Sequence, residues 1–368
     1  MRVLTVLGTR PELIRLSLII PGLDELVDHV LVHTGQNFDA TLSDVFFKEL
    51  GIRQPDHALN IRGASFGEQV GLMLTAVEGI IQQCRPDALL VLGDTNSGLS
   101  AIVAKRAGIP VFHMEAGNRC FDDRVPEEVN RRLIDHASSI LMPYTQRSKE
   151  NLLREGIPCH RIFVTGNPIN EVLTHFEAAI DSTDVLDRLG LTAGEFFLVT
   201  MHRAETVDSE ERLGSLVTAL EAIRDTYDRP VLCSLHPRTR DRMARAGMSF
   251  EGTGIRYLEP LGLFDFVALE KSARCVLTDS GTVQEECSIF RVPSVTLREV
   301  TERPETIEAG SNMLAGVGSG GILRAVSTVL AKPPDWEPPA GYLDTSVSRT
   351  VVKILLSEPL LRSDTRPL

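Results

Sequence analysis

The sequence predicts an α/β protein with two domains, each built around a parallel β-sheet covered by helices on both faces. Short β-branched runs alternate with longer amphipathic segments along all 368 residues, which is the rhythm of βαβ units. The strand candidates are continuous apolar runs, as is typical of parallel strands buried on both sides. A chain of this length exceeds one ordinary core, so two domains of roughly 150–200 residues each are expected.

The expected strands follow one another in both halves of the chain, with helices between them. Amphipathic stretches such as 97–107 and 126–137 are predicted to be helices. The strand candidates are 3–7, 29–33, 88–92, 111–113, 140–142 and 162–164, then 196–200, 231–234, 255–258, 275–277 and 294–297.

A domain boundary is expected where this alternation pauses, between residues 167 and 191. We place the first domain at residues 1–169 and the second at 170–368. A proline-rich loop after Ala331 excludes a helix there. A final amphipathic segment, 345–356, follows it. In two-domain chains of this type a last helix often crosses back, so this segment could pack on the first domain.

Composition excludes several classes of protein. Hydrophobic residues make up 43% and charged residues 24% of the chain, which is ordinary for a soluble globular protein. The net charge of −12 argues against a nucleic-acid or membrane-surface partner. No apolar run reaches the length of a membrane span, and the first is too short for a signal peptide. Six cysteines without a CxxC pair indicate reduced thiols, so we expect a cytoplasmic protein.

Polar residues directly follow many of the expected strands. In open parallel sheets, ligands bind outside the carboxyl ends of the strands. Any one such residue is more often a helix cap or a turn former, but residues from both halves together favour a ligand in a cleft between the domains. These residues are Arg10, Asp94, Glu115, His202, His236 and Ser280.

Two segments have the pattern of anion sites at helix starts. GTRPELIR (8–15) follows the first strand, and Arg10 with the free N–H groups of the helix could bind an anion. A capped helix start without a ligand explains this segment equally well. TDSGTVQEE (278–286) repeats the arrangement, where Ser280 and Gly281 suit a phosphate and Glu286 suits ribose hydroxyls. Glu285 is expected to be solvated or to interact with the helix dipole. With Arg303 from TERPE (301–305), the segment indicates a nucleotide-diphosphate site.

His202 and His236 each follow a strand and precede an arginine. A metal site would need a third ligand at suitable spacing, which the sequence lacks, so no metal is predicted. Diphosphate binding is the preferred interpretation of both histidines. A purely structural role for His236 is an equal alternative.

Three carboxylates, Asp94, Glu115 and Glu127, are concentrated in the first domain. They could be Mg²⁺ ligands, general acids and bases, or partners of Arg119, Arg131 and Arg132 at helical spacing. Glu128 is expected to face elsewhere. A DxD metal motif is absent. Clustered carboxylates raise one another's pKa, which suits proton transfer at a weakly acidic carbon.

With these segments, the chain resembles the non-hydrolysing UDP-N-acetylglucosamine 2-epimerase family. The shared motifs occur in the family's order and cover nearly the whole chain: GTRPE, GDT, H-x-EAG-x-R, PEE-x-NR, VTGN, DSG-x-x-QEE and TERPE. The resemblance implies the GT-B-like fold, in which two Rossmann-like domains face a cleft. It also implies a UDP-sugar substrate, a homodimer and no redox cofactor.

Narrower features resemble the UDP-N-acetyl-L-fucosamine synthase branch, which inverts C2 of UDP-2-acetamido-2,6-dideoxy-L-talose. HTGQNFD (33–39), RQPDH (53–57) and FHMEAGNRCFD (112–122) carry this resemblance. The general epimerases usually have Lys in place of Arg15, a threonine-rich run in place of Asn96 and Ser97, and Gly in place of Thr282.

The mechanism implied by the resemblance removes the C2 proton as UDP leaves C1, and UDP then re-adds with a proton delivered to the opposite face. Asp94, Glu115 and Glu127 are the implied proton-handling group, assisted by His202. Arg10, Arg15, His236, Ser280, Gly281, Glu286 and Arg303 are the implied substrate and UDP ligands.

Four other functions are compatible with the same motifs. They are a UDP-GlcNAc/UDP-ManNAc 2-epimerase, a hydrolysing epimerase, a GT-B glycosyltransferase and an inactive nucleotide-sugar sensor. A glycosyltransferase would need an acceptor groove, and a sensor would not need the three carboxylates.

Overall fold

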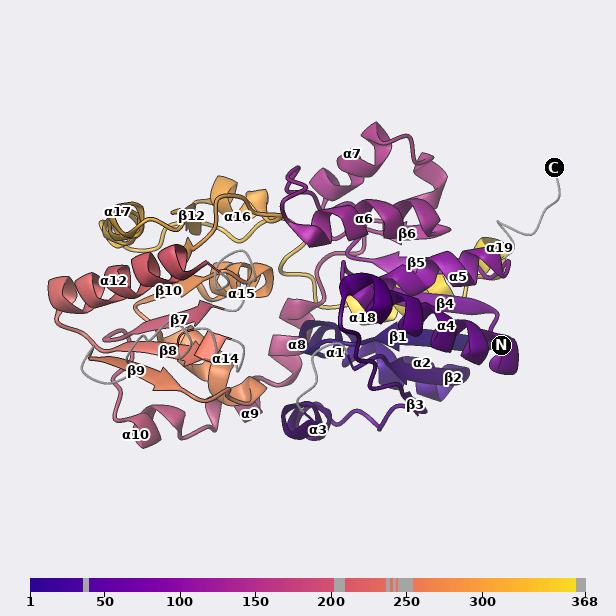
Figure 1. Ribbon diagram of the computed structural model, residues 1–368, viewed down its shortest axis with the longest axis horizontal. Helices are drawn as coiled ribbons and strands as arrows, with labels where there is room; N and C mark the ends of the chain where they lie inside the picture. The colour runs from indigo at the N-terminus through magenta and orange to yellow at the C-terminus, as the bar shows by residue number, and fades with distance from the viewer. Residues whose placement is uncertain (36–39, 202–208, 236–238, 241–242, 244–253, 362–368) are drawn as a thin grey trace. The chain divides into compact units, whose positions relative to one another are not determined.

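The computed structural model describes residues 1–35, 40–201, 209–235, 239–240, 243 and 254–361. The chain divides into two compact units, shown in Figure 1. Unit 1 comprises Met1–Thr174 and Ala340–Leu368, and unit 2 comprises His175–Pro339.

Unit 1 contains a six-stranded parallel sheet in the order β3-β2-β1-β4-β5-β6. The order places β1, β4 and β5 side by side in its middle, so the loops after these three strands emerge at one edge. The strands are β1 (Arg2–Leu7), β2 (Asp28–His33), β3 (His57–Ala58), β4 (Ala88–Leu92), β5 (Val111–Met114) and β6 (Ile140–Met142).

Unit 1 has helices at both predicted stretches, 97–107 and 126–137, and elsewhere around its sheet (Figure 1). They are α1 (Arg10–Leu16), α2 (Ile19–Leu26), α3 (Ala40–Glu49), α4 (Phe66–Cys84), α5 (Ser100–Arg106), α6 (Pro126–Ala137), α7 (Gln146–Arg154) and α8 (Ile169–His175). Short 3₁₀ turns η1 (Asn96–Leu99) and η2 (Cys159–Arg161) precede α5 and follow α7. One apolar core lies between the sheet and α4, α5 and α6.

Unit 2 repeats this plan with a parallel sheet in the order β12-β11-β10-β7-β8-β9. Its strands are β7 (Phe197–Met201), β8 (Val231–Leu235), β9 (Ile255–Leu258), β10 (Cys275–Thr278), β11 (Ser294–Thr296) and β12 (Asn312–Leu314). Its helices are α9 (Glu177–Asp181), α10 (Val185–Leu189), α12 (Glu210–Tyr227), α14 (Leu263–Ser272), α15 (Gly281–Phe290), α16 (Pro304–Ala309) and α17 (Ser319–Val329). The core packs between the sheet, α12 and α17.

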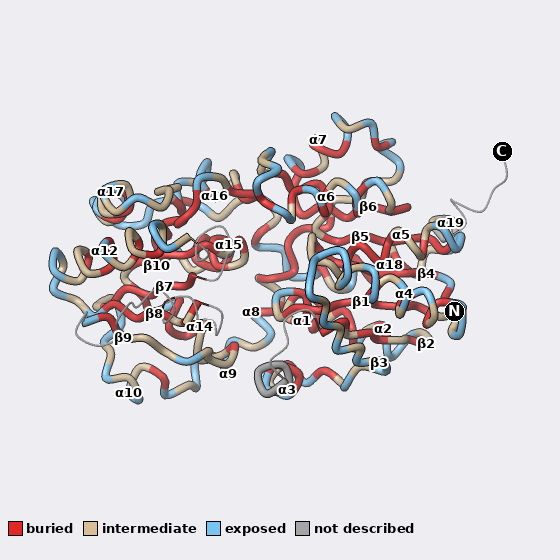
Figure 2. Tube along the Cα trace, viewed as in Figure 1, coloured by how far each residue is buried: buried red, intermediate tan, exposed pale blue. Residues whose placement is uncertain are grey.

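The two parallel sheets confirm the predicted fold class. Figure 2 shows the central strands of both units as buried segments, as their continuous apolar sequences predicted. Three strands differ from the prediction. The run 162–164 forms only an isolated bridge between Ile162 and Leu141. The edge strands β3 and β12 were not predicted, because they have only two and three residues and each begins with a polar residue.

The last part of the chain belongs to unit 1. Helix α18 (Val347–Leu355) packs against α2, and α19 (Glu358–Leu361) follows it; the yellow α18 lies beside the indigo elements in Figure 1. The backbone N–H of Asn167 donates to Gly341 at 2.8 Å, and Ser348 donates to Glu171 through its N–H and its hydroxyl. The Pro-rich segment therefore carries the chain from unit 2 back to unit 1.

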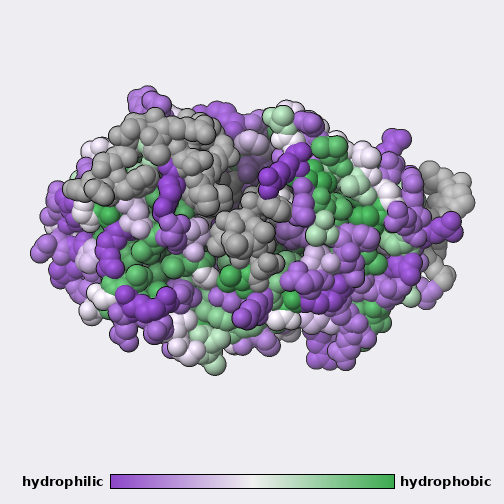
Figure 3. Space-filling view, turned by 60° about the horizontal axis from the view of Figure 1, so that its bottom comes forward, coloured by the Kyte–Doolittle hydropathy of each residue, from purple (hydrophilic) through white to green (hydrophobic). Residues whose placement is uncertain are grey.

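The surface alternates hydrophilic and hydrophobic areas. The face drawn in Figure 3 has several separate hydrophobic patches between charged and polar residues. None of the helices in the described residues is both long and apolar enough to cross a bilayer.

Candidate active site

Glu115 directly follows β5 and has an unusual backbone conformation, with a φ of 65°. A non-glycine residue in the left-handed region is strained, and such strain is concentrated at functional sites. The Glu115 side chain is 9% exposed, and its Oε2 lies 3.8 Å from Nη1 of Arg15. Its Oε1 accepts a hydrogen bond from Asn118 Nδ2 at 3.3 Å. The carboxylate is therefore buried beside a cation at the carboxyl edge of the sheet.

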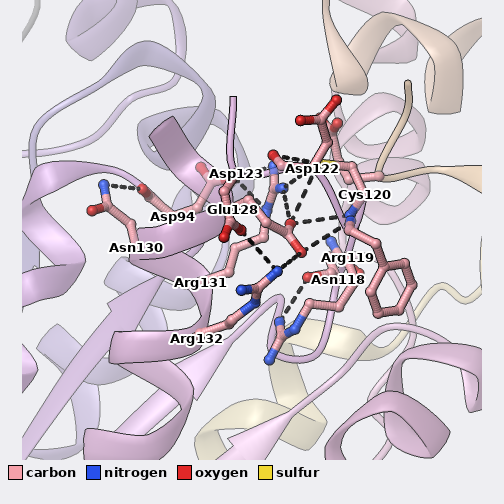
Figure 4. A network of polar contacts seen from close by, with 12 residues as sticks. Asp94, Asn118, Arg119, Cys120, Asp122, Asp123, Glu128, Asn130, Arg131 and Arg132 are labelled. Carbon is pink, nitrogen blue, oxygen red and sulfur yellow. Dashed lines mark hydrogen bonds and ion pairs between the residues drawn. The ribbon is translucent and has the colours of Figure 1, made fainter. Parts of the chain in front are cut away.

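Asp94 follows the neighbouring strand β4 and is held by helix α6. Nε and Nη2 of Arg131 contact its Oδ2 at 2.9 and 2.7 Å. Asn130 donates to its backbone carbonyl at 3.0 Å, as Figure 4 shows. The Asp94 side chain remains 21% exposed, so it is both charge-paired and accessible. The guanidinium therefore fixes the orientation of this side chain at the strand end.

The loops that carry these two carboxylates touch each other. Gly93 has a φ of 72°, and a side-chain carbon there would lie 3.7 Å from Oε2 of Glu115. The structure thus brings Glu115 against the loop of Asp94, as expected for the ends of adjacent parallel strands.

Glu127 lies in the first turn of α6, where it is half-buried. Its neighbour Glu128 corrects the sequence interpretation, because it is completely buried and holds the loop before α6. Glu128 accepts hydrogen bonds from the N–H groups of Cys120 and Phe121 at 3.0 and 3.1 Å and from Arg131 at 2.8 Å. Burial raises the pKa of Glu128, but these N–H donors outweigh it and leave the pKa below its usual value.

Glu128 consequently links the loop to the Asp94 pair. In Figure 4 its carboxylate lies between the Cys120 loop and Arg131, whose other edge binds Asp94. Arg132 also reaches Glu128, at 3.3 Å. Sequence spacing could not distinguish Glu128 from Glu127, since adjacent helical positions differ only in the direction of their side chains.

Arg10 and Arg15 belong to α1, which follows β1. Cζ of Arg10 lies 5.5 Å from the ring centroid of Phe46, a cation–π distance. Arg15 is buried and lies beside Glu115. Helix α1 therefore carries both cations, and Arg15 is the one that lies beside Glu115.

Glu12 closes the start of α1 in a capping box with Thr9, so GTRPELIR contains a capped helix start. Its Oε2 accepts from Gly8 N, Thr9 N and Thr9 Oγ1 at 3.1, 2.8 and 2.7 Å, and its Oε1 accepts from Thr95 Oγ1 at 3.0 Å. Burial raises the pKa of Glu12 to about 7 despite these donors. The T-x-x-E spacing of a capping box is the sequence signal that identifies this residue.

In unit 2, Ser280 is the N-cap of α15 and Gly281 its first residue. Oγ of Ser280 lies 2.8 Å from Oγ1 of Thr282. A side-chain carbon on Gly281 would lie 2.7 Å from Oε1 of Glu302. Glycine is thus required at this helix start, whose free N–H groups are suited to an anion.

The expectation that Glu285 is solvated is wrong. Glu285 is fully buried and pairs with Nε of Arg303, which is itself buried. A second buried pair, Arg298 with Glu302 at 2.8 Å, lies beside it in sequence. A buried carboxylate needs a partner to offset desolvation, and the cation that provides it lies eighteen residues away in the chain.

Glu286 is buried next to another carboxyl, Glu270 of α14. Burial and the proximity of Glu286 raise the pKa of Glu270 well above its usual value. The Cys287 thiol donates to Glu270 at 3.4 Å. The pairing of Glu286 with Glu270 was not apparent from the sequence, because Glu270 lies between two predicted strands with no motif around it.

His202 and His236 lie outside the described residues, as do residues 36–39 of HTGQNFD. Within the residues that are described, no group of three or more His, Cys, Asp or Glu side chains could hold a metal ion.

Comparison with known proteins places this geometry in a family. The family model described as UDP-N-acetylglucosamine 2-epimerase matches residues 23–356. A UDP-N-acetylglucosamine 2-epimerase of Methanocaldococcus jannaschii is 42% identical, with 93% of this chain and 95% of the relative covered. A UDP-2,3-diacetamido-2,3-dideoxy-D-glucuronate 2-epimerase of Pseudomonas aeruginosa is 38% identical, covering 90% and 93%.

The crystal structure of the M. jannaschii UDP-GlcNAc 2-epimerase in complex with UDP-GlcNAc and UDP superposes with a TM-score of 0.92. That alignment has 40% identity and covers 96% of this chain and 99% of the other. The chain therefore belongs to the UDP-N-acetylglucosamine 2-epimerase family and is, as its motifs predicted, an epimerase.

Proposed function

We propose that the protein inverts C2 of a UDP-2-acetamido sugar by eliminating and re-adding UDP. The observation that carries the proposal is the meeting of Glu115 with the Asp94 loop at one sheet edge, each beside an arginine. A base takes the C2 proton while the C1–O bond breaks and UDP leaves with the bonding electrons. The product is a 2-acetamidoglycal. UDP then bonds to C1 again as C2 receives a proton on its opposite face, which requires no redox cofactor.

Unit 1 provides the proton-handling residues in this proposal. Asp94, Glu115 and Glu127 exchange the proton with C2, and His202 assists them. A proton beside an acetamido group is very weakly acidic, so loss of UDP must share the barrier. Arg131 supports this role because its Nε and Nη2 fix the position of the Asp94 side chain.

The diphosphate is assigned mainly to the helix start of α15, with Ser280 and Gly281 as phosphate ligands and Glu286 as the ribose ligand. The N–H groups at that helix start are suited to the charge that develops as UDP leaves. Arg10, Arg15 and His236 complete the proposed set. We assign Arg303 beside the phosphates with a shaping role, because its Nε is engaged by Glu285.

For the sugar, we propose UDP-2-acetamido-2,6-dideoxy-L-talose, converted to UDP-N-acetyl-L-fucosamine. Arg15, which replaces the usual Lys, supports this assignment because it lies 3.8 Å from Glu115. Ser97 also supports the assignment, because its hydroxyl lies 3.0 Å from the hydroxyl of Thr34 at the same end of the sheet. The second candidate is UDP-GlcNAc/UDP-ManNAc epimerisation, favoured by the similarity to relatives such as the UDP-N-acetylglucosamine 2-epimerase of M. jannaschii.

One experiment tests the reaction and the substrate together. The protein is incubated in D₂O with UDP-GlcNAc or with the 6-deoxy-L-talo sugar nucleotide, and C2 is followed by NMR. We expect reversible inversion with deuterium at C2, faster for the L-sugar. Net release of UDP without deuterium at C2 would contradict the mechanism and indicate hydrolysis or glycosyl transfer. Faster exchange with UDP-GlcNAc would select the second candidate.

We further propose a cytoplasmic homodimer. All six cysteines are free, in agreement with a reducing compartment. Light scattering on the purified protein measures the oligomeric state.

A further inference from the structure

A buried charged cluster lies directly behind the loops of Asp94 and Glu115. Its centre is Asp135 of α6, which is 0% exposed. Oδ1 of Asp135 contacts His113 Nδ1 at 2.8 Å, and Oδ2 accepts from Arg119 Nη2 at 2.7 Å and from Gly117 N at 3.1 Å. Burial raises the pKa of Asp135, but His113 and Arg119 outweigh it and hold the pKa below its usual value. Asp135 is therefore a carboxylate with three donors around it.

His113 of β5 connects Asp135 to the loop of Asp94. Its Nδ1 lies 2.8 Å from Oδ1 of Asp135, and its Nε2 lies 2.9 Å from the carbonyl oxygen of Gly93. The ring is 1% exposed, so both contacts are shielded from water. The imidazole therefore bridges α6 and the end of β4.

From this cluster, hydrogen bonds reach the loops of both proposed catalytic carboxylates. His113 fixes the carbonyl of Gly93, the residue before Asp94. Arg119 donates to the carbonyl of Asn118 at 2.7 Å, and Asn118 Nδ2 donates to Glu115. Glu155 holds the far side of Arg119 through Nε and Nη2 at 2.8 and 2.7 Å. The pairing of Arg119 with Glu115 that helical spacing allows is replaced by these contacts.

We propose that Asp135 is a positioning residue of the epimerase, which fixes the loops of Asp94 and Glu115 relative to each other through His113, Gly117 and Arg119. The proposal rests on the proposed function. Asp135 touches no substrate in this role. It acts by restricting the two strand-end loops to one arrangement, and displacement of a catalytic group by about 1 Å can reduce turnover about 100-fold.

The test is Asp135→Asn in the full chain. The new amide keeps the shape of the side chain but replaces one acceptor oxygen with an N–H₂ group, which cannot accept from His113 or from Arg119 and Gly117. We expect kcat to fall by roughly 10- to 100-fold, with KM and the affinity for UDP within about threefold of wild type. The rates are measured by C2 deuterium exchange, and UDP binding by calorimetry.

The same sheet offers a matched control. His29 near the start of β2 contacts Asp24 at 2.6 Å through Nδ1 and Thr5 at 2.8 Å through Nε2, far along the strands from their carboxyl ends. Asp24→Asn removes an equivalent His–Asp contact, although Asp24 is 28% exposed. It should lower the unfolding temperature without changing kcat. If Asp135→Asn lowers only the unfolding temperature, as Asp24→Asn does, the positioning role is wrong.

A second measurement uses the native protein, so it stands even if Asp135→Asn does not fold. In ¹⁵N-histidine-labelled protein, the ring of His113 should show hydrogen bonds to Asp135 and to Gly93, with its signal assigned from His113→Gln. A His113 ring without these hydrogen bonds would overturn the proposal. The two proposals fail differently: wild-type protein without C2 exchange on any UDP-sugar refutes the proposed function and the positioning role with it. If the wild-type protein exchanges C2 and Asp135→Asn exchanges it at the same rate, only the positioning role is refuted.

Discussion

At the residue scale, Asp94 and Glu115 are held by different forces. Asp94 is fixed by charge, through the two nitrogens of Arg131, and Glu115 by a backbone in the left-handed region. We expect Asp94→Asn and Glu115→Gln to lose at least about 100-fold in turnover, as removal of a general acid or base does. UDP affinity should largely survive, as calorimetry can measure. A parallel loss of UDP affinity would assign these residues a structural role instead.

Gly281 gives a second prediction at this scale. In Gly281→Ala, the new methyl would lie 2.7 Å from Glu302, whose carboxylate is fixed by Arg298 at 2.8 Å. We expect a loss of roughly 1–3 kcal/mol in the free energy of unfolding, as in other overpacked sites, and weaker UDP binding. Gly320→Ala is the control, because Gly320 also lies in the first turn of a helix and has open space around it. Thermal denaturation with and without UDP measures both effects, and equal behaviour of the two variants would contradict the prediction.

The sequence was sufficient to predict that Asp94 and Glu115 follow adjacent strands, because a polar residue after an apolar run marks a strand end. The sequence was not sufficient to predict that Glu128 and Glu285 are buried and ion-paired. A glutamate in a helix can be buried and ion-paired or exposed to solvent, and the surrounding sequence is the same in both cases. Glu128 and Glu285 are recognised as buried only from the cations that they contact, Arg131 and Arg303.

At the element scale, the start of α1 should make the stability of unit 1 depend on pH. Burial raises the pKa of Glu12 from 4.5 to about 7, so the folded chain binds this proton more tightly than the unfolded chain. The contribution of Glu12 to the free energy of unfolding is complete below pH 4.5 and is lost as the pH rises through about 7. The free energy of unfolding should fall by about 3 kcal/mol over this interval, from about 1.4 kcal/mol for each pKa unit.

Glu12→Gln should remove this pH dependence, because the amide does not titrate. Glu68→Gln is the control, since Glu68 has the same third position in α4 but is exposed. Urea denaturation of both variants and of wild type between pH 5 and pH 8 measures the slopes. An unchanged slope in Glu12→Gln would mean that Glu12 does not carry the effect.

Most strands and helices could be predicted from apolar periodicity, since long buried strands have a strong pattern. Short edge elements could not. β12 has three residues and begins with Asn312, whose side chain binds Gln284 and Thr306 rather than an apolar core. The run 162–164 has the composition of a strand, but its pairing with β6 is limited to the bridge between Ile162 and Leu141.

At the scale of the whole molecule, the chain leaves unit 1 and returns to it. The stability of unit 1 should therefore depend on α18, which lies near the end of the chain. Val351 of α18 is fully buried. We expect Val351→Ala to cost about 2 kcal/mol, as for other large-to-small core changes, and to weaken amide protection in β1 and β2 but not in β7 and β8. Arg349→Ala on the exposed side of α18 is the control. Hydrogen exchange measures both, and equal loss of protection in the two sheets would contradict the prediction.

The left-handed backbone of Glu115 has a consequence for how this fold can be altered. A β-carbon in that conformation is disfavoured by about 1 kcal/mol or more, so glycine is the residue that the backbone alone would select there. Glu115→Gly should therefore unfold at a higher temperature than Glu115→Ala, while both are inactive. At position 115, stability favours glycine and turnover requires glutamate. Selection of this chain for heat resistance alone should therefore replace Glu115 early and abolish the activity.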